Sequence, residues 1–151
     1  MSQPVNEPIM GYAPGSPERE ALQNEMDRQL GEVIEIPCVV NGELIFTGNT
    51  VTQVVPHNHG HILANVHLAG REEMEAACTA AVDAQEPWIQ LGLEGRCAIF
   101  ERCADLLAGE WRMRVNASTM LNQSKTAFQA EIDSACELID FWRFNCHYAR
   151  G

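Results

Sequence analysis

The stretch from about Ser124 to Tyr148 constrains the fold most, because its apolar residues recur with the period of an α-helix. Phe128 defines the centre of the stripe on a wheel that turns by about 100° per residue. Five further residues fall within about 40° of that centre: Ile132, Ala135, Ile139, Trp142 and Cys146. The sequence therefore predicts a long amphipathic helix whose apolar side needs a covering layer.

The acidic residues of this helix divide into two groups. Asp133, Glu137 and Asp140 fall between about 120° and 180°, on the side predicted to face water, so we expect them to be solvated. Glu131 falls at about 300°, on the flank of the apolar stripe. A carboxylate is costly to bury without a partner. Either Glu131 reaches water or a nearby cation, or it faces a polar cavity and binds a ligand there.

Four shorter helices are also predicted, one near the start of the chain and three farther along it. Ser16 can cap a helix that begins at Pro17 and runs to about Leu30, with Gly31 just past its end. Periodic apolar residues predict further helices over residues 71–85, 96–108 and about 115–120. Pro87 is expected to end the first of these three.

Between the first of these helices and the other three, the sequence pattern changes to that of strands. Asn41-Gly42 lies between two apolar runs, the strongest short-range signal for a β-hairpin. Residues 50–55 predict another strand, Pro56 to Gly60 a turn, and His61 to Leu68 a returning strand. The first third is therefore predicted to hold a small set of antiparallel strands. Residues 1–15 are rich in Pro and Gly and are expected to form an extended arm.

Composition excludes several classes of function. The formal net charge of -11 argues against nucleic acid and against an anionic membrane surface, since both need basic residues. No apolar run approaches the roughly 20 residues that span a bilayer. Residues 1–16 lack the basic and apolar regions of a secretory signal. The six cysteines are therefore predicted to be free thiols, and none lies beside a base that would make it a nucleophile.

Two tempting motifs are weak. His57, His59 and His61 alternate as zinc ligands on one strand would, but Gly60 and the surrounding turn break the alternation. Hydrogen bonding in the turn or packing at the surface is the favoured interpretation, and no metal site is predicted. Lys125 follows no glycine-rich loop, so we expect a first-turn helix residue that is exposed or paired with an acidic neighbour.

Three stretches, in this order and at this spacing, carry a resemblance to a known family. They are residues 6–19 with Asn6-Glu7-Pro8-Ile9, residues 36–61 with Ile36-Pro37-Cys38, and residues 129–145 with Gln129-Ala130-Glu131-Ile132-Asp133. Together they resemble the start of the eukaryotic-type 1-pyrroline-5-carboxylate dehydrogenases, within the aldehyde dehydrogenase superfamily. The resemblance covers nearly the whole chain, from about Asn6 to Tyr148.

The resemblance implies a fold and an activity. The fold is an α+β fragment of an α/β aldehyde dehydrogenase: residues 1–15 are an arm, and residues 16–151 are an incomplete N-terminal segment that precedes the nucleotide-binding core. The family oxidises glutamate γ-semialdehyde to glutamate with NAD in proline catabolism. Its members form homo-oligomers and, in eukaryotes, lie in the mitochondrial matrix. Because no presequence is visible, a cytoplasmic location also stays open.

The resemblance also implies which site residues to expect. The family's catalytic cysteine, general base and NAD-binding turn have no match in this chain, so no catalytic or cofactor-binding residue is expected and the chain alone is predicted to be inactive. Glu131 matches a helix glutamate that lines the substrate's access route, which makes it the predicted substrate-binding residue. Phe141, Trp142 and Phe144 are expected near that cavity or in the core. The alternative function is a non-catalytic, truncated product that binds a protein through its helices.

Overall fold

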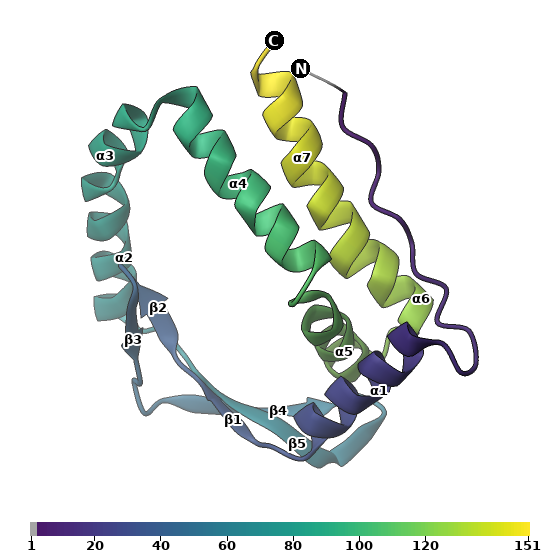
Figure 1. The fold of residues 1–151 in the computed structure, drawn as a ribbon. Coiled ribbons are helices and arrows are strands. Elements are labelled where there is room, and N and C mark those ends of the chain that lie inside the picture. Colours follow the sequence, from purple (N-terminus) through teal and green to yellow (C-terminus); the bar gives the residue numbers. More distant parts are fainter. Residues whose placement is uncertain (1–2) are drawn as a thin grey trace.

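The computed structural model describes residues 3–151 and contains a small mixed sheet, a hairpin and a set of helices (Figure 1). The elements follow one another as α1 (Pro17–Leu30), β1 (Ile34–Ile36), β2 (Cys38–Val40), β3 (Glu43–Ile45), β4 (Thr50–Val55), β5 (Asn58–His67), α2 (Arg71–Asp83), α3 (Gln85–Gln90), α4 (Gly92–Ala108), α5 (Arg112–Gln123), α6 (Ala127–Ala130), a π-helical turn η1 (Glu131–Cys136) and α7 (Glu137–Ala149).

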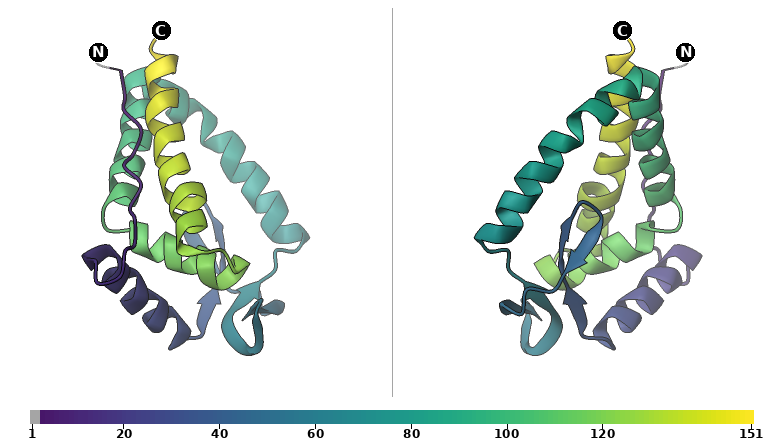
Figure 2. Two further views of the ribbon diagram at one scale, coloured as in Figure 1. Left: turned by 90° about the vertical axis from the view of Figure 1, so that its right-hand side faces the viewer. Right: turned by 90° about the vertical axis from the view of Figure 1, so that its left-hand side faces the viewer.

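The predicted first helix is confirmed, together with its capping residue. The Oγ of Ser16 accepts a hydrogen bond from the Arg19 amide, and the Gly31 amide donates to the carbonyls of Asp27 and Arg28. Residues 3–13 form no helix or strand. They run alongside α7 in the opposite direction, and the two views of Figure 2 show the same neighbourhood.

The strands confirm the hairpin and correct two other expectations. Asn41 and Gly42 have φ of 52° and 80°, the left-handed values that a two-residue hairpin turn requires. β5 begins at Asn58, so the predicted turn is limited to Pro56 and His57. β4 pairs with β5 in antiparallel fashion, as predicted.

The expectation of a purely antiparallel set is wrong, because β1 pairs with β5 in parallel. Residues 34–36 were not predicted to be a strand, although two of the three are isoleucine. The hairpin and β4 lie between β1 and β5 in the chain. They return the chain to the end of the sheet at which β1 starts, so that β5 can run in the same direction as β1. They thereby serve as the crossover connection that a parallel pair needs.

The bounds of the helices between residues 71 and 123 differ from those that the sequence pattern predicts. The helix predicted over 71–85 ends before Pro87, at Asp83, but Pro87 then occupies the third position of a further helix, α3, where a backbone N–H has no partner within the helix in any case. α4 and α5 begin at Gly92 and Arg112, about one turn before their predicted starts. The second of these differences matters, because it brings Arg112 into a helix.

The long final helix is present, but it starts later than predicted and contains an irregular turn. Ser124 adopts a left-handed conformation with φ of 54°, and Thr126 then caps α6. The Thr126 side chain accepts a hydrogen bond from the Gln129 amide, and the Gln129 side chain accepts one from the Thr126 amide. The π-helical turn η1 then separates α6 from α7.

This π-helical turn corrects the helical wheel. A π turn contains one residue more than an α turn, so everything before it is rotated by about 100°, the angle of one residue. Phe128, the predicted centre of the apolar stripe, is 62% exposed. Glu131 instead comes into line with Ala135 and Ile139, which are completely buried as predicted.

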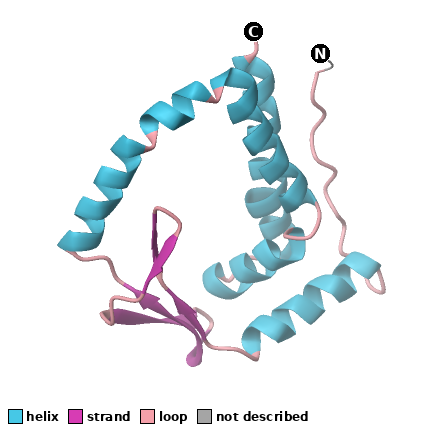
Figure 3. Ribbon diagram, turned by 60° about the vertical axis from the view of Figure 1, so that its left-hand side comes forward, coloured by secondary structure: helices cyan, strands magenta, loops and turns pink. Residues whose placement is uncertain are grey.

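Within residues 3–151, most of the buried apolar residues belong to three small clusters rather than to one core. The first joins α4 to η1 and α7 through Ala104, Leu107, Ala135 and Ile139. The second surrounds Tyr12, Leu22 and Ala117, and the third surrounds Val55, Leu63 and Leu121. In contrast, β1, β2, β3, α2 and α3 contain no buried residue. Figure 3 shows α2 and α3 as a rod at the edge of the molecule. Within residues 3–151, no helix is long and apolar enough to cross a membrane.

Candidate functional site: a buried ionic cluster at the N-terminal arm

The centre of the site is an ion pair between Glu131 of η1 and Arg112 of α5. Their side chains are 0% and 2% exposed, respectively. One carboxylate oxygen of Glu131 accepts from Nη2 of Arg112, and the other accepts from Nε at 3.3 Å. This two-point geometry is the strong form of a guanidinium–carboxylate contact.

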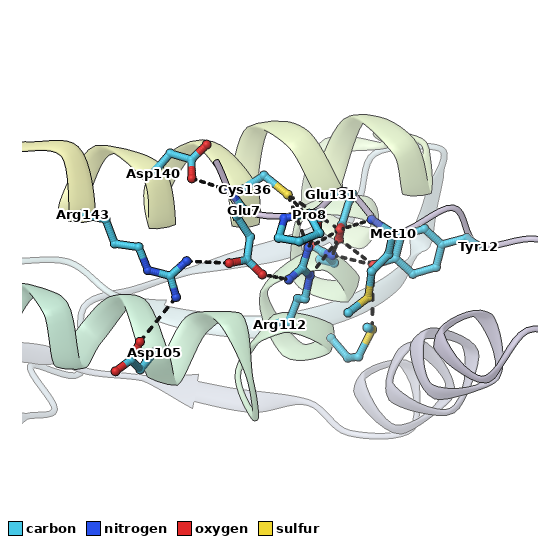
Figure 4. Close-up of polar contacts among 12 residues, drawn as sticks. Glu7, Pro8, Met10, Tyr12, Asp105, Arg112, Glu131, Cys136, Asp140 and Arg143 are labelled. Carbon is cyan, nitrogen blue, oxygen red and sulfur yellow. Dashed lines mark hydrogen bonds and ion pairs between the residues drawn. The ribbon is translucent and has the colours of Figure 1, made fainter. Parts of the chain in front are cut away.

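Three nitrogen or hydroxyl donors also surround Glu131, and the Cys136 thiol donates to Oε1 at 3.7 Å. The Met10 amide donates to Oε1 at 2.8 Å, and the Tyr12 hydroxyl donates to Oε2 at 2.7 Å. The Asn116 side-chain amide, on α5, also donates to Oε2, at 2.8 Å. The nearby cation that one of the two explanations for Glu131 requires is therefore present, and the N-terminal arm covers the carboxylate (Figure 4).

The charge of Glu131 is stabilised despite its burial. Burial alone would raise the pKa of this carboxyl, but the hydrogen bonds from Arg112, the Met10 amide and Tyr12 outweigh it and lower the pKa to about 2. The pKa of Tyr12 changes in the opposite direction, because burial and the hydrogen bond to Glu131 both raise it. Glu131 is therefore ionised and Tyr12 protonated across the physiological range.

Glu7 extends the cluster from α5 to α7. Its two oxygens accept from Nη1 of Arg112 and from Nη1 of Arg143, each at 2.6 Å. Its backbone amide donates to Oδ1 of Asp140 at 2.7 Å, and the Asn6 side chain donates to Oδ2 at the same distance. The expectation that Asp140 is simply solvated is therefore wrong, because it holds the arm.

We call this set, formed by residues 6–12 with Arg112, Asn116, Glu131, Asp140 and Arg143, the arm cluster. It joins the start of the chain to residues more than 100 positions later. Cys136 lies at its edge, where burial and the charge of Glu131 raise the pKa of its thiol to about 11. A thiol that stays protonated is a poor nucleophile.

A surface hollow of about 340 Å³ lies beside the arm cluster. Its lining combines carboxylates and aromatic rings, contributed by Asn6, Glu137, Asp140, Phe141 and Phe144. Glu137 is exposed, and Phe141 is 60% exposed. Phe141 is therefore not a core residue, and the carboxylate of Glu137 is accessible where that of Glu131 is not.

The other residues singled out in the sequence have local roles. Lys125 pairs with Asp133 at 2.6 Å, as predicted, but it lies in the loop before Thr126 and not in the first turn of a helix. His57 and His61 contact different partners, Ser124 Oγ at 2.7 Å and the Leu30 carbonyl at 2.9 Å. Within residues 3–151, no group of three His, Cys, Asp or Glu side chains could hold a metal ion. All six cysteines are free thiols.

Sequence reasoning missed Glu7, Tyr12 and Arg112. A carboxylate on an apolar stripe signals a buried cation, but ten basic residues were available and the pattern did not choose among them. Arg112 also lay outside the helix predicted from Val115 onward. The arm had no periodicity from which contacts could be predicted.

Comparison with known proteins provides independent evidence about this chain. A model of the aldehyde dehydrogenase family matches residues 46–151. The Delta-1-pyrroline-5-carboxylate dehydrogenase of Agaricus bisporus is 44% identical over 146 residues, which cover 95% of this chain and 26% of that protein. The human mitochondrial enzyme of the same name is also 44% identical, over 96% of this chain and 26% of its own length. The chain thus spans about a quarter of these relatives.

Solved structures agree with the sequence comparison. The Mycobacterium tuberculosis Delta-pyrroline-5-carboxylate dehydrogenase bound with NAD and cobalamin superimposes with a TM-score of 0.96 at 44% identity, over 99% of this chain and 28% of that one. A Thermus thermophilus 1-pyrroline-5-carboxylate dehydrogenase mutant gives 0.89 at 26% identity, over 99% of this chain and 29% of that one. The resemblance noted in the sequence and the predicted fold class are both confirmed.

Proposed function

The chain belongs to the aldehyde dehydrogenase family, and from this premise we propose that it works as part of an enzyme that oxidises glutamate γ-semialdehyde to glutamate with NAD in proline catabolism. The similarity to Delta-pyrroline-5-carboxylate dehydrogenases over 99% of the chain carries this proposal. The NAD bound in the Mycobacterium tuberculosis structures supports NAD as the cofactor. The mitochondrial relatives support the matrix as its location in a eukaryote.

The reacting groups are proposed to come from other parts of that enzyme. Oxidation of an aldehyde by this family needs a thiolate nucleophile, a base and a bound dinucleotide. Cys97, Cys136 and Cys146 are buried in this chain, and burial raises the pKa of both Cys136 and Cys146 to about 11. These three thiols are therefore unsuited to attack a substrate, and we assign the chain a role in shaping the substrate's surroundings.

The hollow beside the arm cluster is the surface best suited to that role. Glutamate γ-semialdehyde has an ammonium group, which a carboxylate attracts and which aromatic rings can flank. Glu137 supplies an accessible carboxylate there, and Phe141 and Phe144 supply rings. We therefore propose that this face of α7 contacts the substrate in the whole enzyme.

Substrate binding by Glu131 stays a prediction. Both of its oxygens are already occupied by donors from this chain, so direct contact would require the arm to move away. The contacts support an indirect role, in which Glu131 fixes the arm and the helix start next to the hollow. Its predicted place along the substrate's access route is compatible with that role.

A chimera tests the proposed function. This chain would replace the matching segment of the Agaricus bisporus relative, and NADH formation would be followed with glutamate γ-semialdehyde and NAD. We expect turnover close to that of the parent enzyme. A chimera that folds and binds NAD but forms no NADH with this substrate would refute the assignment.

Two carboxylate variants in the chimera separate the roles of Glu137 and Glu131. We expect Glu137→Gln to raise KM for the semialdehyde by about tenfold, the effect of about 1.4 kcal/mol, without lowering thermal stability. We expect Glu131→Gln to lower stability, because Arg112 would lose its buried counter-charge. An unchanged KM in Glu137→Gln would contradict the proposed contact.

The alternative function, a truncated product that binds a partner protein, makes a different prediction about the gene. Sequencing the transcript beyond Gly151 distinguishes the two. An open frame that continues into a glycine-rich turn and a cysteine segment supports the dehydrogenase, and an in-frame stop supports the binding module. Assembly of the whole enzyme as a homo-oligomer also stays a prediction.

A further inference from the structure

Glu7 occupies an unusual position, because a single carboxylate connects two helices through two cations. Its side chain is 11% exposed, and each oxygen accepts from a different guanidinium at 2.6 Å. Arg112 belongs to α5 and Arg143 to α7. Charge pairs at such short distances and low exposure are screened little by water and salt.

The residues that Glu7 contacts on α7 lie one turn apart and next to the hollow. Its amide binds Asp140, which itself lines the hollow, and its carboxylate binds Arg143. Phe141 and Phe144, the two rings of the hollow, lie on the same stretch of helix. Figure 4 shows Glu7 between Arg143 on one side and Arg112 on the other.

The second partner of Arg143 provides a weaker contact. Asp105 on α4 reaches the other guanidinium nitrogen at 3.3 Å and is 65% exposed. Exposed pairs of this kind contribute little, about 0–1 kcal/mol. Arg112, in contrast, keeps Glu131 as a buried partner when Glu7 is removed. Loss of the Glu7 charge is therefore expected to make α7 more mobile around Arg143 and to leave the ion pair between Glu131 and Arg112 intact.

We propose that Glu7 is a positioning residue, which fixes the turn of α7 from Asp140 to Phe144 so that the hollow fits the semialdehyde substrate. This inference rests on the proposed function. Glu7 acts through α7 and touches no reacting atom. Its removal should therefore weaken substrate binding and leave the chemical step, which other parts of the enzyme carry out, nearly unchanged.

The test uses Glu7→Gln in the chimera with the Agaricus bisporus relative. We expect KM for glutamate γ-semialdehyde to rise about fivefold to twentyfold, with kcat and KM for NAD within about twofold. Arg143→Gln should have a similar effect, and the double variant should be no worse than either single one, because both remove the same contact. Asp105→Asn is the matched control, which removes the other partner of Arg143, and should stay within about twofold of the parent.

An unchanged KM in Glu7→Gln, or equal losses in Glu7→Gln and Asp105→Asn, would overturn the proposal. A chimera without any turnover would refute the proposed function but not decide about Glu7. Hydrogen exchange in the 151-residue chain then decides. Faster exchange from Asp140 to Phe144 in Glu7→Gln, but not in Asp105→Asn, supports the positioning role, and unchanged exchange there contradicts it.

Discussion

Glu131 and Arg112 can both be buried because each charge has several partners at once. Glu131 accepts from Arg112, Met10, Tyr12 and Asn116, and Arg112 also donates to Glu7 and to the Pro8 carbonyl. Such a pair is weak evidence for net stability, but removal of one member leaves a buried charge without its partner. The periodicity of the sequence identified Glu131 as unusual and could not identify its partners, since three of them, Met10, Tyr12 and Arg112, lie in the arm or at a helix start without a sequence signal.

Removal of Arg112 tests this view of the cluster. We expect Arg112→Met to lower the free energy of unfolding by about 3–5 kcal/mol, measured by chemical denaturation. The double variant with Glu131→Leu should lose less than the sum of the two single variants, because no charge is left alone. Arg28→Met serves as a control, because this arginine of α1 is 51% exposed, and it should change stability by less than about 1 kcal/mol. Additive losses would contradict the coupling.

Acid should weaken the fold through Glu131. Its pKa in the folded chain is lowered from 4.5 to about 2, so the folded state favours the ionised form. The resulting stability is fully present above about pH 4.5 and is lost as the pH falls toward 2. Denaturation curves across this window should show a smaller pH dependence in Glu131→Gln than in the parent chain. Identical slopes would show that other carboxyl groups cause the acid effect.

The π-helical turn is the element that brings Glu131 into the cluster. A plain α-helix from Ala127 to Ala149 would place Phe128 on the buried stripe and Glu131 on its flank, as the wheel predicted. The π turn instead exposes Phe128 and buries Glu131. Such turns often occur at functional sites. The sequence shows no signal for it, since its Ala, Ile and Glu residues suit an α-helix equally well. Capping residues and the hairpin turn, in contrast, were predictable because local chemistry determines them.

Deletion of one residue from the π turn tests its role. Removal of Asp133 should restore regular α-helical geometry and rotate Glu131 by about 100° away from Arg112. We expect a loss of about 3–5 kcal/mol in unfolding free energy and faster hydrogen exchange at the Met10 amide. Asp133→Ala is the matched control: it loses only the surface pair with Lys125 and should cost less than about 1 kcal/mol. Equal effects of the two changes would contradict the geometric role.

At the scale of the whole molecule, buried residues lie around the arm cluster, on α4 and where β4 and β5 meet α5, while the hairpin, α2 and α3 contain none. The overall architecture was predictable through family resemblance, because three motifs in the correct order identify the fold. The parallel pairing of β1 with β5 was not, since a three-residue strand has too few positions for a pattern. Val39 and Leu44 pair across the hairpin and are 64% and 62% exposed.

The open apolar surfaces predict association of the isolated chain. Exposed apolar patches of this kind bind to other copies of the chain when no partner covers them. Analytical ultracentrifugation should show concentration-dependent oligomers, and Leu44→Lys should reduce them without lowering unfolding free energy. A strictly monomeric chain that unfolds in one sharp transition would count against this prediction.

We propose that these 151 residues shape a substrate site and depend on other parts of an enzyme for the reaction. The most direct measurement is NADH formation by the purified chain in the presence of glutamate γ-semialdehyde and NAD, with the active chimera as a positive control. We expect no NADH from the chain at any substrate concentration. Turnover by the chain alone would contradict the central claim.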